Sequence, residues 1–219
     1  MTPGRTLPAT RRDPVGVRRR IMTAATSEFA RQGFAGARVD RIASAACINK
    51  QLLYYHIGDK EALYLAVLEA AYADIRSAEH TLQLDAAEPA EAIARLVAFT
   101  WQYFLDHPEF LALLNTENLR QARTLKRSSA VTQIHSPFVG MIAAVLQRGE
   151  QCGAFRPGVD AVQLYISIAG LAYFYVGNSA TLSVIFGLDL LSTEALAARL
   201  QHMQELVLAG LAVRAAPPC

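Results

Sequence analysis

Residues 48–64, INKQLLYYHIGDKEALY, place two adjacent tyrosines, a histidine, two lysines, a glutamine and an asparagine in one short segment. Asn49 can cap the first turn of a helix, and Gly58 can end that helix after about two turns. Leu53 and Ile57, which are four residues apart, would share its buried face. The polar side chains would then project from the opposite face, where they can reach a partner.

Two more helices are predicted upstream of this segment. In the first, which ends at Gly33, apolar residues recur every four positions: Val17, Ile21, Ala25 and Phe29. In the second, they follow the spacing of a short amphipathic helix: Val39, Ile42, Ala43 and Ala46. A tight turn at Cys47-Ile48 joins this helix to the next one. The order predicts a helix-turn-helix, whose second helix lies in the major groove of DNA.

The exposed face of the third helix carries side chains that suit DNA. Lys50 and Gln51 can meet the edges of guanine and adenine. Tyr54 and Tyr55 can offer a hydroxyl to a phosphate and a ring to a thymine methyl. Beyond this helix, Asp59 can cap a long fourth helix that has Lys60 in its first turn.

Positive charge is concentrated in the same part of the chain. Residues 1–60 hold nine Arg and two Lys against four acidic residues, a net charge of +7, whereas the remainder carries −5. The arginines at positions 11, 12 and 18–20 can follow the minor groove or the DNA backbone, or they can form a solvated arm. The basic end is therefore the candidate for binding a polyanion.

Beyond Pro89 the sequence contains only helix-length apolar segments and no strand alternation. We predict helices within 89–107, 108–122, 137–153, 160–187 and 192–212, and an all-α fold. The predicted organisation is a basic flexible arm (1–15), a helix-turn-helix DNA-binding domain (16–60), a helical effector-binding and dimerisation domain (61–214) and a tail (215–219).

Several classes of protein are disfavoured. Three widely spaced cysteines without a CxxC pair indicate neither a disulfide framework nor a metal site, and a cytoplasmic location without a secretion signal fits best. No nucleophile elbow, P-loop or HExxH motif points to an enzyme or a cofactor. Residues 161–188 carry no charge, which leaves a membrane anchor as an alternative, although internal polar residues and flanking aspartates weigh against it.

Residues 18–70 resemble the DNA-binding domain of the tetracycline-repressor (TetR) family, through "IASAA", "LLYYHI" and "DKEAL" in register. The resemblance implies that Lys50, Gln51 and Tyr55 face bases, and that Tyr54, His56 and Lys60 hold phosphates. Two positions depart from the family pattern. Cys47 replaces the usual turn glycine, and Ala37-Arg38 replaces a capping Thr or Ser, so that Arg38 supplies a charge there. Asn49 is also expected to contact DNA.

The resemblance also implies a homodimeric transcriptional regulator, most often a repressor, that leaves a palindromic operator when a small molecule binds. An activator or a constitutive DNA-binding protein of the same fold is the alternative. The C-terminal half resembles a subgroup that includes regulators of pyrimidine and nicotinate breakdown. We expect the dimer to form through the helices of residues 160–187 and 193–213. The expected contacts are small residues on the first helix and an apolar stripe on the second: Gly170, Ala172, Gly177, Ala180, Leu196, Leu200, Met203, Leu206, Val207 and Gly210.

Aromatic residues are concentrated in the C-terminal half, and they predict a pocket for a small planar aromatic or heterocyclic effector. The expected ligand contacts are four aromatic and three polar side chains: Trp101, Phe104, Phe138, Tyr173, Glu117, Asn118 and Asn178. The alternative is that the aromatics are simply core and that the polar residues cap or cross-link helices.

Overall fold

The computed structural model describes residues 14–213, apart from the side chains of residues 132 and 134–136. Within these residues the chain forms ten α-helices, one short 3-10 helix and no strand, which confirms the all-α prediction. The chain divides into two compact units, residues 1–67 and 68–219, with the boundary inside α4. Most of the predicted N-terminal arm and the whole tail lie outside the described residues.

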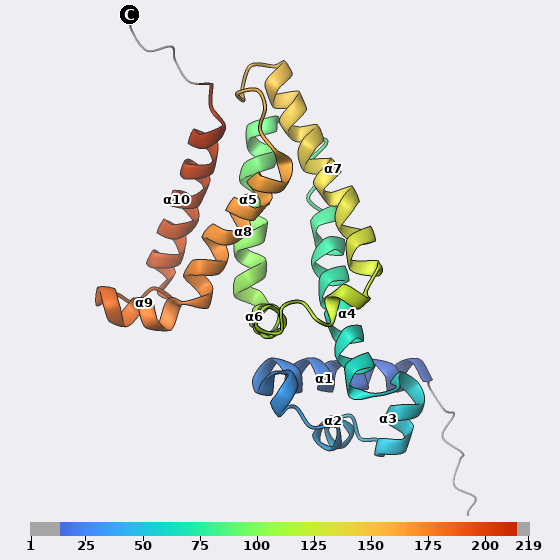
Figure 1. Ribbon diagram of the computed structural model, residues 1–219. Helices are drawn as coiled ribbons and strands as arrows, with labels where there is room; N and C mark the ends of the chain where they lie inside the picture. Colours follow the sequence, from blue (N-terminus) through green and yellow to red (C-terminus); the bar gives the residue numbers. More distant parts are fainter. Residues whose placement is uncertain (1–13, 214–219) are drawn as a thin grey trace, which may run out of the picture. The chain divides into compact units, whose positions relative to one another are not determined.

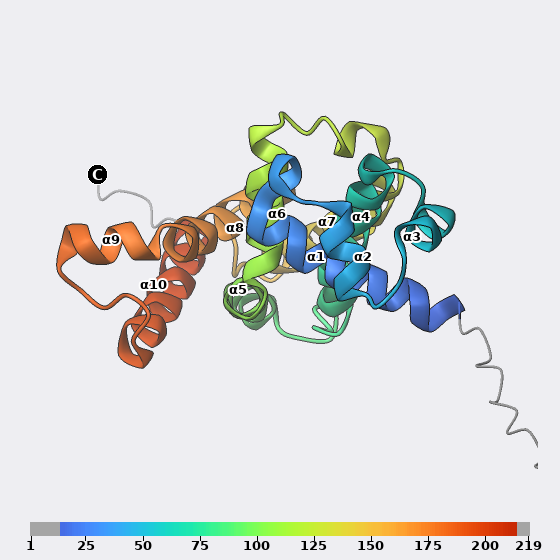
Figure 2. The same ribbon diagram turned by 90° about the horizontal axis from the view of Figure 1, so that it is seen from below.

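The first unit is a small three-helix domain completed by the start of α4 (Figure 2). Its helices are α1 (Pro14–Gly36), α2 (Val39–Ala45), α3 (Lys50–Ile57) and α4 (Lys60–His80). Ile21, Phe29 and Leu53 are fully buried, and the Phe29 ring lies 4.8 Å from that of Tyr64. The predicted apolar stripes therefore form its core.

Local hydrogen bonds set the ends of these helices. The side-chain oxygen of Asn49 accepts the Leu52 N–H at 2.7 Å and caps α3, as predicted. Asp59 caps α4 in the same way through the Ala62 N–H, also at 2.7 Å. Inside α1, Gly33 adopts φ 64° and ψ 175°, so the regular helix ends there. The positive φ explains why glycine occupies this position.

The turn between α2 and α3 contains a strained residue. Cys47, which stands where the TetR pattern has glycine, adopts φ 55°. A side chain in this left-handed region costs roughly 1 kcal/mol, because Cβ crowds the following carbonyl.

We expect Cys47→Gly to stabilise the first unit by up to about 1 kcal/mol, because removing Cβ relieves this crowding. The greater conformational freedom of glycine in the unfolded chain offsets part of this gain. Denaturant titration of the full chain measures the effect. Cys152→Gly is the control, because Cys152 is also exposed but has φ −89°. A lower stability for Cys47→Gly than for the parent would contradict the strain.

The second unit is built around α5 (Pro89–Asp106), which packs against α7 (Ala130–Gln151), α8 (Ala161–Gly177) and α10 (Thr193–Leu211). Proline opens α5, and its buried face includes Ile93, Leu96 and Trp101. The remaining elements are α6 (Pro108–Leu119), the 3-10 helix η1 (Leu125–Arg127) and α9 (Ser179–Phe186). Figure 1 shows α8 and α10 side by side, with α9 projecting from their ends.

Two predicted helix boundaries are wrong. Residues 160–187 form α8 and α9, which are bent by 70° at Asn178, and not one helix. The Asn178 side chain donates to the Phe174 carbonyl at 2.9 Å, a local bond that competes with helix continuation. Conversely, α7 continues through Pro137, which was expected to break it. Packing of α7 against α5 and α8 offsets the backbone hydrogen bond that proline removes.

Within residues 14–213, no single helix is long and apolar enough to cross a bilayer. The bent pair α8 and α9 is long and apolar enough only when its two helices are taken together, and only by length and composition.

Candidate functional site

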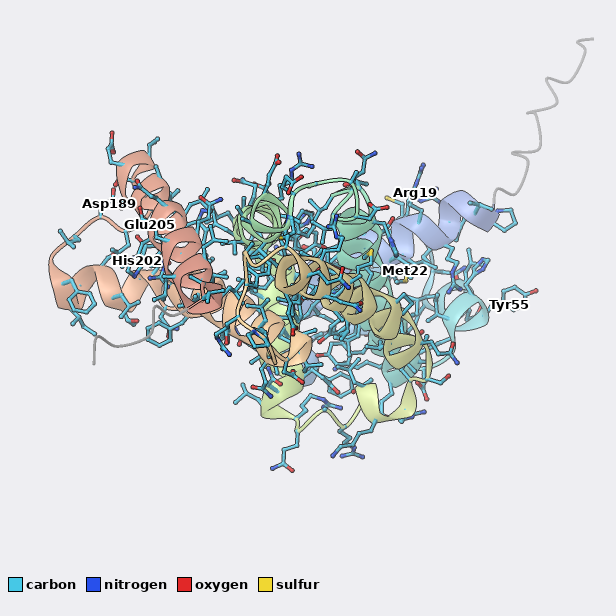
Figure 3. The ribbon with its side chains drawn as sticks, turned by 90° about the horizontal axis from the view of Figure 1, so that it is seen from above. Arg19, Met22, Tyr55, Asp189, His202 and Glu205 are labelled. Atoms are coloured by element: carbon cyan, nitrogen blue, oxygen red, sulfur yellow. The ribbon has the colours of Figure 1, made fainter. Side chains whose placement is uncertain are left out.

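The outer face of α3 presents an unusual set of exposed side chains. Leu53 is fully buried, whereas Tyr54 and Tyr55 are 41% and 84% exposed, and Gln51 is exposed beside them. Figure 3 shows the Tyr55 side chain projecting outward from α3. Two exposed tyrosines next to a free amide suit a surface that binds a partner.

Lys50, at the start of α3, is already paired. Its Nζ lies 2.9 Å from Oδ1 of Asp40 on α2 and 6.0 Å from the centre of the Tyr54 ring. The hydrogen bond to Asp40 raises the pKa of Lys50 above its ordinary value, so the amine stays charged. To reach a base, Lys50 must exchange Asp40 for DNA, a requirement that the sequence did not reveal.

Basic residues of α1 lie beside the end of α3. Arg18 Nη1 donates to the His56 carbonyl at 3.5 Å, and the half-buried His56 ring contacts Tyr55 edge-on at 5.5 Å. Arg19 and Met22, labelled in Figure 3, line an apolar groove together with Arg18 and His56. The predicted phosphate contact His56 thus has two arginines nearby, which strengthens the positive potential there.

Lys60 is the first residue of α4, and it is also held in place. Its Nζ donates to the Ala35 carbonyl at 3.4 Å and lies 4.9 Å from the centre of the Phe34 ring. The ammonium group is therefore positioned beside the positive end of α4, the arrangement that suits a phosphate.

The start of α2 has no side-chain cap, but a buried carboxylate holds the backbone of the residue before it. The Arg38 side chain is exposed and makes no cap, but its N–H donates to Glu28 Oε1 at 3.1 Å. Glu28 is only 4% exposed and also lies 3.5 Å from Arg41 Nη1. Glu28 is thus a positioning residue that the sequence analysis missed. Its place on the Ile21, Ala25 and Phe29 stripe was the available signal.

The predicted aromatic contacts of the second unit do not gather in one cavity. Trp101, Phe104 and Phe138 are buried in the main core, where Trp101 packs edge-on against Tyr175 at 5.4 Å. Tyr173 is half-buried, and its hydroxyl donates to Asn115 Oδ1. The structure does bring Phe138 to Tyr165 of α8, with ring centres 5.0 Å apart.

The polar residues expected to orient a ligand have other roles. Buried Glu117 accepts from the N–H groups of Thr124 and Leu125 at 2.6 and 2.9 Å, so it holds the loop after α6. Asn118 is exposed, and Asn178 ends α8 through its bond to Phe174. The prediction that these side chains face an internal ligand is therefore wrong for Asn118. Glu117 cross-links the loop after α6, and Asn178 bonds to the backbone at the end of α8, as the alternative expected.

A groove of about 690 Å³ lies between α8 and α10. Phe174 and Leu206 line the groove and are 59% and 48% exposed. Gly170 and Gly210 also line it, and no atom lies within 4 Å of the place where a Cβ atom would stand at either glycine. Further along α8, Val162 and Ile166 are also exposed. An apolar face of this kind suits a second helical pair.

The opposite faces of the same helices are buried in the unit's own core. Ala172 and Met203, which were expected at a dimer contact, are both 0% exposed, whereas Val207, 7% exposed, lines the groove. The prediction is wrong for Ala172 and Met203, because one apolar stripe in the sequence includes both the residues that face the core and those that line the groove.

Comparisons with known proteins agree with this geometry. The model of the family "Bacterial regulatory proteins, tetR family" matches residues 21–67, and that of "Tetracyclin repressor-like, C-terminal domain" matches residues 89–207.

Two relatives and one solved structure extend the likeness along the chain. The HTH-type transcriptional repressor NicS of Pseudomonas putida is 38% identical over 87% of this chain and 90% of its own length. The HTH-type transcriptional repressor SCO4008 of Streptomyces coelicolor is 34% identical over 75% of this chain and 81% of its own length. The crystal structure of SCO4942 from Streptomyces coelicolor superposes with a TM-score of 0.67 at 25% identity, covering 89% of this chain and 98% of that one. With a helix-turn-helix unit, a helical second unit and matches to both family models, the chain belongs to the TetR family of bacterial transcriptional regulators.

Proposed function

We propose that this protein represses transcription as a homodimer, with residues 16–60 bound to a palindromic operator and residues 61–214 binding an effector and a second subunit. The exposed face of α3, with Gln51, Tyr54 and Tyr55 projecting from a basic unit, carries the proposal. NicS and SCO4008 are both named repressors, which supports repression over activation.

Each exposed side chain has a distinct role at the DNA. Gln51 and Tyr55 read base edges in the major groove, and Lys50 joins them after leaving Asp40. Tyr54, His56 and Lys60 contact phosphates, which hold α3 in register without reading sequence. Asn49 and Arg38 contribute at the ends of α3 and α2, Asn49 mainly by capping and Arg38 by its exposed charge.

The effector acts through a coupling free energy. A dimer must present its two α3 helices one DNA turn apart, about 34 Å, to fit both half-sites. A small molecule that favours a different spacing weakens DNA binding by the same factor by which DNA weakens its own binding. A planar aromatic or heterocyclic compound suits the aromatic residues of the second unit, of which Phe138 and Tyr165 form a packed pair.

Selection of bound duplexes from a random DNA pool tests this function. We expect enrichment of a palindrome whose half-sites lie one helical turn apart. Gln51→Ala should change the preferred base at one position of each half-site, because it removes a bidentate base contact worth about 1–3 kcal/mol. Lys60→Gln is the matched variant, and it should weaken all sequences alike. No enriched sequence, or a changed preference only in Lys60→Gln, would contradict the assignment.

A further inference from the structure

Asp40, in the first turn of α2, is an exposed acidic residue of the basic first unit. Its side chain is 72% exposed. Two other acids of this unit have structural roles, because Asp59 caps α4 and buried Glu28 holds the Arg38 N–H and pairs with Arg41. A carboxylate that is exposed on a DNA-binding unit repels phosphates. The position of Asp40 therefore requires an explanation.

The partner of Asp40 is the lysine at the start of α3. Lys50 Nζ lies 2.9 Å from Asp40 Oδ1, and the Lys50 side chain is 47% exposed. The same amine lies 6.0 Å from the centre of the Tyr54 ring. The two charged groups thus belong to the two helices of the helix-turn-helix and are exposed together. An exposed ion pair of this kind contributes little to stability, so the fold does not depend on it.

The Asp40–Lys50 pair presents a hydrogen-bond acceptor and a donor side by side. An ionised carboxylate only accepts hydrogen bonds, whereas an ammonium group only donates them. In the major groove, a G·C base pair displays the complementary groups, which are the O6 and N7 acceptors of guanine and the N4 donor of cytosine. Guanine O6 and cytosine N4 are hydrogen-bonded to each other, so they lie roughly 2.9 Å apart. That separation matches the distance between Lys50 Nζ and Asp40 Oδ1.

We propose that Asp40 is a specificity-determining residue, which reads a cytosine when Lys50 reads the guanine paired with it. When Lys50 leaves Asp40 for guanine, the released carboxylate accepts a hydrogen bond from N4 of that cytosine. One ion pair within the protein is thereby exchanged for contacts to both members of a single base pair. The inference rests on the proposed function and adds Asp40, which was not among the DNA contacts expected from the sequence.

Other partners on DNA leave part of the Asp40–Lys50 pair unsatisfied. At a phosphate, Lys50 gains a contact, but Asp40 is left unpaired and is repelled by the phosphate charge. C·G and A·T base pairs present the donor and the acceptor in the reversed order. A T·A pair presents them in the same order as G·C, but its methyl group stands in place of guanine N7, the second acceptor for the ammonium. The pair therefore favours G·C in one orientation.

Selection of bound duplexes from a random DNA pool, carried out with the parent and with Asp40→Asn, tests the proposal. The parent should select G·C at one position of each half-site, and the two positions should be related by the symmetry of the palindrome. Asp40→Asn should lower the preference for cytosine there by about fivefold or more. Adenine should gain in its place, because an amide suits adenine N6 and N7. An unchanged preference for G·C would overturn the proposal.

Lys50→Gln provides a second variant. Because Lys50 and Asp40 read one base pair, Lys50→Gln should lose the preference for guanine at the same position that Asp40→Asn changes. Changes at two different base pairs would overturn the proposal. Glu91→Gln is the matched control, since Glu91 forms an exposed ion pair with Arg95 at 2.6 Å on α5 of the second unit. It removes the same charge and should leave every base preference unchanged.

A purely structural or purely repulsive role for Asp40 gives different results. If Asp40 only held α3 in place, Asp40→Asn would weaken binding to all sequences alike. If Asp40 only repelled phosphates, the variant would bind all sequences more tightly by the same factor. Either outcome, without a changed base preference, would overturn the proposal. Thermal unfolding should give a Tm for Asp40→Asn within about 3 °C of the parent, because the ion pair is exposed.

The selection separates a wrong role for Asp40 from a wrong function for the protein. A palindrome that is enriched equally by the parent and by Asp40→Asn would leave the proposed function intact and overturn only the reading of cytosine by Asp40. The absence of any enriched sequence for the parent would contradict the proposed function, and the role of Asp40 with it.

Discussion

Raising the salt concentration from about 50 to about 200 mM is expected to weaken operator binding by about 1,000-fold. This magnitude follows if the dimer neutralises six phosphates, three from each subunit. The described part of the first unit offers more than that number of exposed or half-buried cations: Arg18, Arg19, Arg20, Arg31, Arg38, Arg41, Lys50 and Lys60. Fluorescence anisotropy of a labelled operator at several salt concentrations measures the slope.

Lys60→Gln should lower the magnitude of that slope by about two, because each subunit loses one phosphate contact. Arg95→Gln is the matched control. Arg95 is an exposed cation on α5 of the second unit, paired with Glu91 at 2.6 Å, and its loss should leave the slope unchanged. An affinity that is nearly independent of salt would mean that the phosphate contacts assigned to the first unit are wrong.

A charge placed in the groove between α8 and α10 should abolish both dimerisation and tight DNA binding. Leu206 is 48% exposed in the single chain, so Leu206→Glu leaves the core intact while burying an unpaired carboxylate in any dimer that uses this face. We expect a monomer at micromolar concentration by sedimentation. Operator affinity should fall about 100-fold or more, because the second half-site is no longer bound intramolecularly.

Leu119→Glu provides the comparison, since Leu119 on α6 is 87% exposed but lies outside the groove. It introduces the same charge and should keep the parent's dimer and affinity. A dimeric Leu206→Glu protein would show that the subunits associate through another surface, and the assignment of α8 and α10 would then have to be abandoned.

The features that the sequence determined by itself are local. The four-residue repeat of Ile21, Ala25 and Phe29 defines the buried face of α1, and Leu53 with the Asn49 cap defines α3. These depend on helical periodicity and on hydrogen bonds between residues three or four apart, so they can be derived without a partner helix. The exposed face of α3 follows directly, because burying Leu53 leaves Gln51, Tyr54 and Tyr55 outside.

Only the tertiary structure determined what the buried polar residues contact. Glu28 and Arg76 are both buried, and the partners that they meet on other segments cannot be read from the residues next to them in sequence. Glu28 accepts the N–H of Arg38, the residue before α2, and Arg76 donates to Tyr165, 89 positions away. Such contacts join distant segments, and a periodic pattern contains no information about them.

The two faces of α8 and α10 were separated only by packing. Apolar residues extend from the core side of each helix to the groove, so the sequence assigned Ala172, Met203 and Leu206 to the same contact. The fold buries the first two against their own unit and leaves Leu206 at the groove. Helix α5 determines which side of α8 and α10 is buried, because it packs against both helices and can cover only one side of each. Sequence determined which residues are apolar, and the neighbouring helix determined which of them remain available to a second subunit.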